Sequence, residues 1–270
     1  MTTPIDRRRL LRNSGLVVSL GALAAACGEG RGGPEEPGRV GIAPAREPLP
    51  TGEVDDVILL RTAQSIEYTA IELYAVAVGL DALDAATVAV TDRFVQDHTE
   101  HAGRLGELIT AAGGEEYRCP NNWYMERAVA PVLDAVEGTD DLVRDLLNIA
   151  HAFETVAGAM YQAIVGSLTE PELRYESMLI GADEVRHAAT LAMAITGTPE
   201  GYVNPDLLGI EPEPGADGIA MPYAIPSQFG QLGSTELVVG PRDEGGGRFS
   251  IILQTPAENS FVYDFLTCEA

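Results

Sequence analysis

The 270-residue sequence predicts a mainly α-helical protein: an antiparallel four-helix bundle built from two repeated helix hairpins, with a small C-terminal β segment. Three observations support this fold class. Apolar residues recur every three or four positions from Val54 to Thr196, as in helices with one buried face. Within this region, residues of the first half recur in the second half 86 or 87 positions later. After Gly201 the sequence is instead rich in Gly and Pro and contains short runs typical of strands.

Residues 1–27 have the features of an export signal. Paired arginines in "DRRRLLR" precede a short apolar run that ends in "LAAAC", a pattern that resembles a twin-arginine signal. The apolar run, Leu16–Ala26, is roughly half as long as a membrane-spanning helix. The small residues before Cys27 resemble a lipoprotein cleavage site, after which Cys27 would carry lipid. Cleavage nearby by an ordinary signal peptidase is the alternative.

Residues 28–53 are predicted to form a flexible linker, because they are rich in Gly, Pro and charged residues and cannot bury a core. Together with the signal, this linker predicts a protein exported to the outer face of the cytoplasmic membrane or the cell envelope. A lipid on Cys27 would anchor the protein to the membrane. The bundle is then expected over residues 54–200 and a C-terminal extension over residues 201–270.

The protein is strongly acidic, with a formal net charge of −24 at pH 7. Removal of a signal that contains four arginines would make the remaining chain more acidic still. A surface of this charge repels the phosphates of nucleic acids, so no nucleic-acid partner is expected.

Two cysteines, Cys119 and Cys268, remain beyond Cys27. In an exported protein, two such cysteines are expected to form a disulfide. A cysteine metal centre is the alternative, although the two residues lack the close spacing of a zinc site.

The first three predicted helices span residues 53–79, 85–112 and 140–167. The fourth begins at a capping box formed by Thr169 and Glu172, with Pro171 in its first turn. It ends near Thr196, before Gly197. The links within each helix pair are short, which indicates antiparallel neighbours. The longer connector between the pairs, residues 113–138, is predicted to contain a short helix around residues 123–136.

The internal repeat covers an entire helix hairpin, with polar and apolar positions matched together. A shift of 87 residues aligns Glu67 with Glu154 and Tyr74 with Tyr161. A shift of 86 residues aligns the pair His98 and His101 with the pair Glu184 and His187.

The C-terminal extension contains three strand candidates and no recognisable catalytic motif. The candidates are "TELVV" from Thr235, "RFSIIL" from Arg248 and "SFVYDFL" from Ser260. They predict a small antiparallel sheet or hairpin packed on the bundle.

Glu67 and Glu154 lie in the middle of apolar stripes, so each is expected to face the core. A buried carboxylate is costly to desolvate and needs a cation, strong hydrogen-bond donors or a raised pKa. For one glutamate alone, a hydrogen bond to a tyrosine would be the simpler interpretation. Residues three apart share a helix face, so Glu184 and His187 can point inward together, as can His98 and His101.

With these residues, Val54–Thr196 resembles the ferritin-like superfamily, and the export signal resembles that of its exported bacterial branch. The resemblance implies a dimetal site whose ligands are Glu67, His98, His101, Glu154, Glu184 and His187. Two divalent metals are expected as cofactors, with iron or manganese favoured and zinc not excluded. The implied function is an oxidoreductase that acts with dioxygen or peroxide. The alternative is a non-catalytic module of the cell envelope that sequesters metal or binds a partner.

The sequence departs from the family pattern at His98, where a glutamate is expected. The adjacent acids Asp97 and Glu100 do not replace it, because they are turned away from His98 around the helix. Three carboxylates and three imidazoles neutralise two divalent metals less fully than four carboxylates and two imidazoles. The change is expected to weaken one metal position, to leave a mononuclear site, or to favour a different metal.

Three further residues are expected around the ligands. His151, one turn before Glu154, is a potential seventh ligand, but a hydrogen bond to a ligand is favoured. Tyr74 and Tyr161 are expected to pack in the core and to bond to ligand carboxylates, with a redox role as the less favoured alternative.

Overall fold

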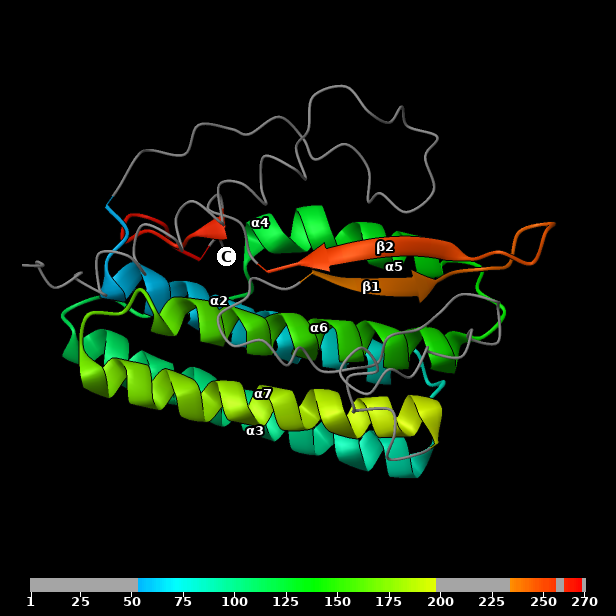
Figure 1. Ribbon diagram of the computed structural model, residues 1–270, viewed down its shortest axis with the longest axis horizontal. Coiled ribbons are helices and arrows are strands. Elements are labelled where there is room, and N and C mark those ends of the chain that lie inside the picture. The colour runs from blue at the N-terminus through cyan, green and yellow to red at the C-terminus, as the bar shows by residue number, and fades with distance from the viewer. Residues whose placement is uncertain (1–52, 198–233, 256–259, 269–270) are drawn as a thin grey trace, which may run out of the picture.

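The computed structural model describes residues 53–197, 234–255 and 260–268. Four long helices form the bundle: α2 (Asp56–Gly79), α3 (Ala85–Ala111), α6 (Leu142–Val165) and α7 (Pro171–Thr196). Helices α2 and α3 form one hairpin, and α6 and α7 form the other. In Figure 1, α3 and α7 lie along one side of the bundle, and α2 and α6 lie between them and the remaining elements. The mainly helical fold class is therefore confirmed.

The first three long helices begin at an aspartate cap. Asp55 accepts a hydrogen bond from the Ile58 N–H at 2.9 Å, and Asp84 accepts one from Thr87 at 2.7 Å. Asp141 does the same for α6, accepting from the Arg144 N–H at 3.2 Å. These side chains satisfy N–H groups that have no partner within the helix.

The predicted capping box at the start of α7 is wrong. The N-cap is Glu170, whose side chain makes no capping hydrogen bond. Thr169 instead binds Asp56 at the start of α2: its N–H donates to Oδ1 at 2.8 Å and its hydroxyl to Oδ2 at 2.5 Å. A charged carboxylate is a stronger hydrogen-bond acceptor than an uncharged group. Thr169 therefore bonds to Asp56, and this contact joins the two hairpins. The predicted end of α7 is correct, since Gly197 has a φ of 69° and terminates the helix.

The connector between the hairpins is helical, as predicted. It contains α4 (Asn122–Tyr124), a π-helical segment η1 (Met125–Val129) and α5 (Ala130–Val136). The Asn121 side chain caps the first turn by accepting from the Tyr124 N–H at 3.0 Å.

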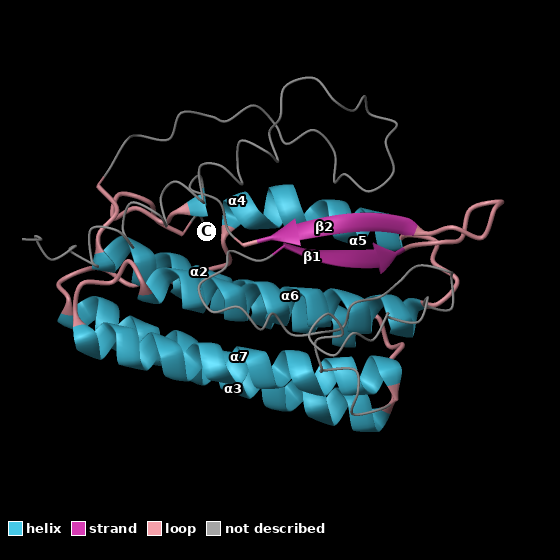
Figure 2. Ribbon diagram, in the orientation of Figure 1, coloured by secondary structure: helices cyan, strands magenta, loops and turns pink. Residues whose placement is uncertain are grey.

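A two-stranded antiparallel sheet covers part of α6. Strand β1 (Ser234–Val239) pairs with β2 (Phe249–Gln254), and the sheet lies on the same side of the bundle as α5 (Figure 2). Buried polar groups of α6 hold β1, because Asn148 donates to the Val238 carbonyl and Asp145 accepts from the Gly240 N–H, at 2.9 and 2.8 Å. Two of the three strand candidates are thus strands.

The third candidate, residues 260–266, is not a strand. Its backbone groups bond to side chains of α2 and of the connector instead of a neighbouring strand. The Val262 N–H donates to Thr62, and Asn121 donates to the Ser260 carbonyl, both at 2.9 Å. Arg61, fully buried in α2, donates to the Leu266 carbonyl at 2.6 Å. These bonds hold the segment, which includes a turn closed by the Leu266 N–H and the Tyr263 carbonyl, without sheet pairing.

The predicted disulfide between Cys119 and Cys268 is confirmed. The two Cα atoms lie 5.9 Å apart, within the range that a disulfide requires. The bond attaches the last described residues to the connector, next to the segment held by Arg61.

None of the helices in the described part of the chain combines the length and apolar character that a membrane span requires.

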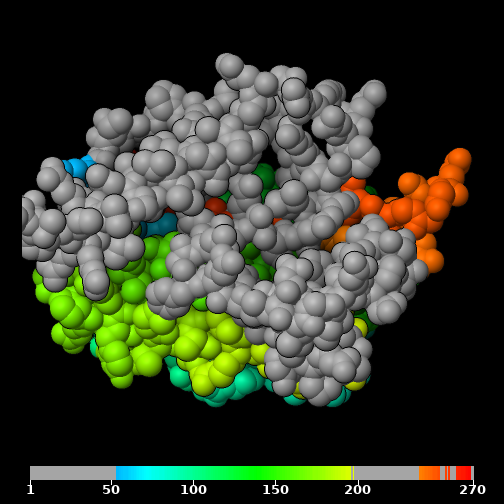
Figure 3. Space-filling view, viewed as in Figure 1, coloured from blue at the N-terminus to red at the C-terminus, as the bar shows by residue number. Residues whose placement is uncertain are grey.

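The space-filling view shows α7, with α3 below it, at the lower face of the molecule (Figure 3).

Candidate metal centre

The six predicted ligands come from the middle of all four long helices and meet inside the bundle. Each is buried, with no more than 7% of its surface exposed. Helix α2 provides Glu67, α3 provides His98 and His101, α6 provides Glu154, and α7 provides Glu184 and His187.

Their ligand atoms form two overlapping groups. Within each group the nitrogen and oxygen atoms all lie within 4.8 Å of one another. The first group, here called the Glu67 position, contains Glu67, His98, His101 and Glu184. The second, the Glu154 position, contains His98, Glu154, Glu184 and His187. Because His98 and Glu184 belong to both groups, the arrangement could hold two adjacent metal ions, with these two side chains common to both groups.

Glu184 and His101 leave buried ligand atoms that a cation could satisfy. Both carboxylate oxygens of Glu184 and the Nδ1 of His101 are buried without a hydrogen-bond partner. Nδ1 and Oε1 of these residues lie 2.9 Å apart, but not in hydrogen-bond geometry. A buried carboxylate without donors is costly, and a divalent cation would satisfy it. The donor set is therefore compatible with metal binding.

Each central glutamate accepts a hydrogen bond from a tyrosine of another helix, as predicted. The Tyr161 hydroxyl donates to Glu67 Oε1, and the Tyr74 hydroxyl donates to Glu154 Oε1. Burial, together with the nearby carboxylates, raises the pKa of both tyrosines well above its usual value. They consequently act as donors that fix the orientation of the carboxylates.

Two aspartates support the histidines in a way that sequence reasoning missed. Asp97 on α3 lies 3.3 Å from Nε2 of His187 on α7, and Asp183 on α7 lies 3.3 Å from Nε2 of His101 on α3. Asp97 is turned away from His98, but that direction faces the neighbouring helix. The internal repeat contains a sign of this arrangement, since Asp97 and Asp183 align at the 86-residue shift. Such a carboxylate fixes the tautomer and orientation of a metal-binding imidazole.

His151 and Phe94 complete the surroundings. His151 is buried on α6 but belongs to neither ligand group, so its contact with a ligand stays a prediction. Phe94, which the sequence reasoning did not single out, stacks on the His187 ring at 4.1 Å between ring centroids.

The charges of the cluster are strongly coupled. Burial alone would raise the pKa of Glu67, but His101 and His98 outweigh it and lower the pKa to about 2. Burial would lower the pKa of His101, but Glu184 and Glu67 raise it to about 10. Burial and the Glu67 charge raise the pKa of Glu184 to about 7. Without a metal, imidazolium protons thus compensate the carboxylates, and a metal would displace these protons.

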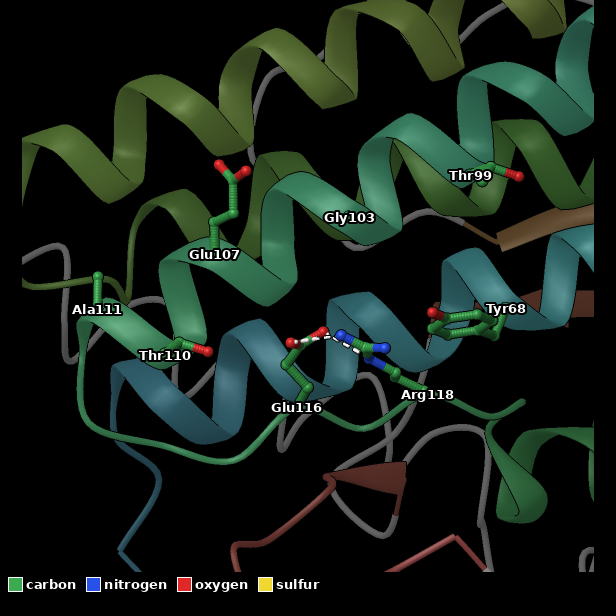
Figure 4. A pocket seen from close by; sticks show the side chains of 8 residues that line it. All are labelled: Tyr68, Thr99, Gly103, Glu107, Thr110, Ala111, Glu116 and Arg118. Atoms are coloured by element: carbon green, nitrogen blue, oxygen red, sulfur yellow. Dashed lines mark hydrogen bonds and ion pairs between the residues drawn. The ribbon is translucent and has the colours of Figure 1, made fainter.

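A surface hollow between α2, α3 and the connector is separate from this cluster. It is lined by Tyr68, Thr99, Gly103, Glu107, Thr110, Ala111, Glu116 and Arg118 (Figure 4). An ion pair between Glu116 and Arg118, at 2.8 Å, borders it. None of the six clustered residues lines it.

An antiparallel four-helix bundle in which every helix turns a glutamate or a histidine inward belongs to the class of bundles whose core side chains can hold metals. The family model of the ferritin-like domain matches residues 55–197. This match covers more than half of the 270 residues, and the chain belongs to the ferritin-like domain family. No curated protein and no solved structure gives a significant match.

Proposed function

We propose that the protein is an exported ferritin-like oxidoreductase that binds up to two divalent metals, iron or manganese, and acts with dioxygen or peroxide. One observation carries the metal-binding part. Six buried side chains from four helices converge, and the two oxygens of Glu184 among them have no hydrogen-bond partner. Mixed imidazole and carboxylate donors suit iron and manganese, and also fit zinc.

The chain's own residues would hold and orient the metals, which when bound supply electron-transfer chemistry toward the oxidant. The glutamates and histidines are the ligands. Tyr74 and Tyr161 hold the central carboxylates, and Asp97 and Asp183 hold the outer imidazoles. Burial of the whole set excludes bulk water from the centre.

Export is part of the same proposal. The twin-arginine pattern and Cys27 motivate it, and the disulfide between Cys119 and Cys268 supports it. Structural disulfides persist in oxidising compartments and are rare in the cytosol. The lipid on Cys27 would hold the protein at the outer face of the membrane.

A second candidate is a non-catalytic module that sequesters metal or binds a partner. The observation in its favour is His98, which leaves three carboxylates to neutralise two divalent metals. A centre that holds its metals less firmly is less suited to repeated redox cycles.

Metal analysis of protein purified from its native compartment tests the proposal. We expect up to two equivalents of iron or manganese per chain, and consumption of dioxygen or peroxide by the loaded protein. A double variant, Glu67→Gln with Glu154→Gln, should lose both properties. The matched control Glu107→Gln changes an exposed glutamate of α3 and should keep them. Metal without oxidant consumption would favour the second candidate, and no metal even after anaerobic reconstitution would exclude both metal functions.

A further inference from the structure

Residues 260–268, here called the C-terminal segment, are held against α2 and the connector mainly by polar contacts. Arg61 donates to three carbonyls of the segment, those of Val262, Tyr263 and Leu266, at 3.3, 3.2 and 2.6 Å. Of its apolar side chains, only those of Val262 and Tyr263 are buried, and neither belongs to the main apolar core. Phe261 touches that core but stays half-buried. The segment is therefore bound to the bundle without forming part of its interior.

The side chains that hold the segment also have partners within α2 and the connector. These further bonds run from Arg61 to the Glu115 carbonyl, from the Thr62 hydroxyl to the Ile58 carbonyl at 2.8 Å, and from Asn121 to the Ser65 hydroxyl at 2.9 Å. The surface under the segment is thus organised by its own contacts. It does not need the segment in order to stay folded.

Burial of Arg61 opposes closure of the segment. The side chain of Arg61 is 2% exposed, and the carboxylate of Asp264 beside it, at 3.9 Å, belongs to a side chain that is 62% exposed. Such an exposed partner compensates a charge weakly, and a buried charge without close compensation is costly. Release of the segment would return the guanidinium to water. This gain offsets part of what the polar contacts contribute.

The disulfide between Cys119 and Cys268 is the covalent tie across this interface. Cys268 is exposed and Cys119 is half-buried, so a thiol in solution can approach the bond from the side of Cys268. Exposed disulfides are the ones that serve as labile or regulatory bonds. The β hairpin differs, because Leu237, Val239 and Leu253 are buried in the main core.

We propose that the C-terminal segment is a redox-controlled strap. A dithiol reduces the disulfide, and the segment then leaves α2 while the bundle and the β hairpin stay folded. Reduction uncovers Arg61 and Thr62 on α2, the helix that carries Glu67. This inference goes beyond the proposed function and does not depend on a bound metal.

The reduction proceeds by two thiol–disulfide exchanges. One thiolate of the dithiol attacks the sulfur of Cys268, the S–S bond breaks, and Cys119 leaves as a thiolate that takes up a proton. The second thiolate of the reagent then attacks the mixed disulfide and releases Cys268, which is protonated in turn. The protein gains two electrons and two protons, and the dithiol becomes a disulfide.

Hydrogen exchange of the natural protein, measured by mass spectrometry with and without dithiothreitol, tests the strap. Peptides that cover residues 260–268 should exchange about tenfold faster or more after reduction, because local opening no longer has to break a covalent bond. Peptides of α6 and β2 should not change. Unchanged protection of the segment would overturn the inference, and so would a bond that is reduced only when the bundle helices lose protection as well.

The double variant Cys119→Ser with Cys268→Ser repeats the test without a thiol. Its segment should exchange as fast as that of the reduced natural protein, whereas protection equal to that of the oxidised protein would contradict the strap.

Chemical modification of arginine gives an independent readout of the uncovered surface. Arg61 should react with phenylglyoxal about tenfold faster or more in the reduced protein, since its guanidinium gains access to solvent. Arg186, whose side chain is 75% exposed on α7, is the matched control and should react equally in both states. An unchanged rate at Arg61 would show that the segment still covers α2 after reduction.

Discussion

At the scale of single residues, the centre consists of groups that hold one another in charged or oriented states. Two carboxylates accept from tyrosines, and two imidazoles face aspartates of the opposite helix. Glu184 has no hydrogen bond from a tyrosine but lies 2.9 Å from Nδ1 of His101, and burial and the Glu67 charge raise its pKa to about 7. A bound cation would favour its charged form.

Replacement of Tyr161 by Phe should destabilise the metal-free protein. It removes the hydroxyl that donates to Glu67, and a hydrogen bond to a charged group contributes about 1.5–3 kcal/mol. Tyr74→Phe should have a similar effect through Glu154, because the two pairs are related by the repeat. Urea unfolding measures both, with Tyr175→Phe on the exposed face of α7 as the control. Equal stability of Tyr161→Phe and the control would contradict the role of the hydroxyl.

The metal-free protein should lose stability as the pH rises above neutral. Burial lowers the histidine pKa values, but the glutamates outweigh it and raise them to about 10 for His101 and about 9 for His187, from 6.5. The folded state binds these protons more tightly than the unfolded chain, so their contribution is complete below pH 6.5 and is lost as the pH rises through 9 and 10.

Melting temperatures of the metal-free protein between pH 6 and pH 10 check this dependence. The metal-loaded protein is the control, because its histidines bind metal in the unprotonated form and metal binding strengthens as protons leave. A melting temperature of the metal-free form that rises over this range would contradict the sign.

At the scale of elements, close approach of α6 and α7 positions the tyrosine of one helix beside the glutamates. A Cβ atom at Gly181 of α7 would lie 2.7 Å from the Cβ of Tyr161 on α6. Only glycine allows the two helices this separation. The contact fixes Tyr161, whose hydroxyl reaches Glu67 on α2.

Gly181→Ala should therefore destabilise the protein by about 1–3 kcal/mol, the usual cost of overpacking a core. Displacement of Tyr161 should also weaken Mn²⁺ binding. Gly103→Ala is the matched control in α3, because a Cβ atom there meets nothing within 4 Å. Removal of a helix-interior glycine at an open site stabilises by up to about 1 kcal/mol. The midpoint of urea unfolding should fall for Gly181→Ala and rise for Gly103→Ala, relative to the natural protein. A shift of both midpoints in the same direction would contradict the packing argument.

At the scale of the whole molecule, the C-terminal segment is part of the folded unit. Arg61, Thr62 and Asn121 bind its backbone, and the Cys119–Cys268 disulfide attaches it to the connector. The segment thereby covers α2 on the side away from α3 and α7.

Cys119→Ser with Cys268→Ser should lower stability substantially. The bond spans 149 residues of sequence. A disulfide that closes a loop of this length reduces the conformational entropy of the unfolded chain. In the chain-entropy account it stabilises the folded state by up to about 5 kcal/mol. Urea unfolding with and without reductant measures the effect, since reduction of the natural protein should reproduce the double variant. If the natural protein titrates as two free thiols, the segment is held by packing alone.

Arg8→Lys with Arg9→Lys tests the proposed export. The double variant should block export while the charge is kept, because a twin-arginine signal is recognised by a receptor. Cys27→Ser should leave export intact and release the protein from the membrane, because it removes the proposed lipid. Cell fractionation and the mass of the mature protein measure both. If the Cys27→Ser protein stays in the membrane fraction, and its mature mass differs from that of the natural protein only by the substitution, lipidation is excluded.

Much of the fold and the clustering of the six side chains could be predicted because the responsible patterns are local. The helical period placed Glu67 and Glu154 on buried faces. The repeat related the pair His98 and His101 to the pair Glu184 and His187, which indicated that both pairs face the same core. The segment from Ser260 could not be predicted in this way. Its alternating pattern is typical of a strand, but a strand needs a partner, and its backbone binds Arg61 and Thr62 instead.

The sequence by itself determined the four helices, the six clustered side chains and the departure at His98, since these depend on residue type and spacing along one chain. Only the tertiary structure decided that Asp97 and Asp183 face histidines across the seam of α3 and α7, and that Thr169 joins Asp56. It also decided that the two nitrogens of His98 face different glutamates. The physical reason is that such contacts depend on how the helices are rotated and packed against one another, which the period of a single helix does not specify.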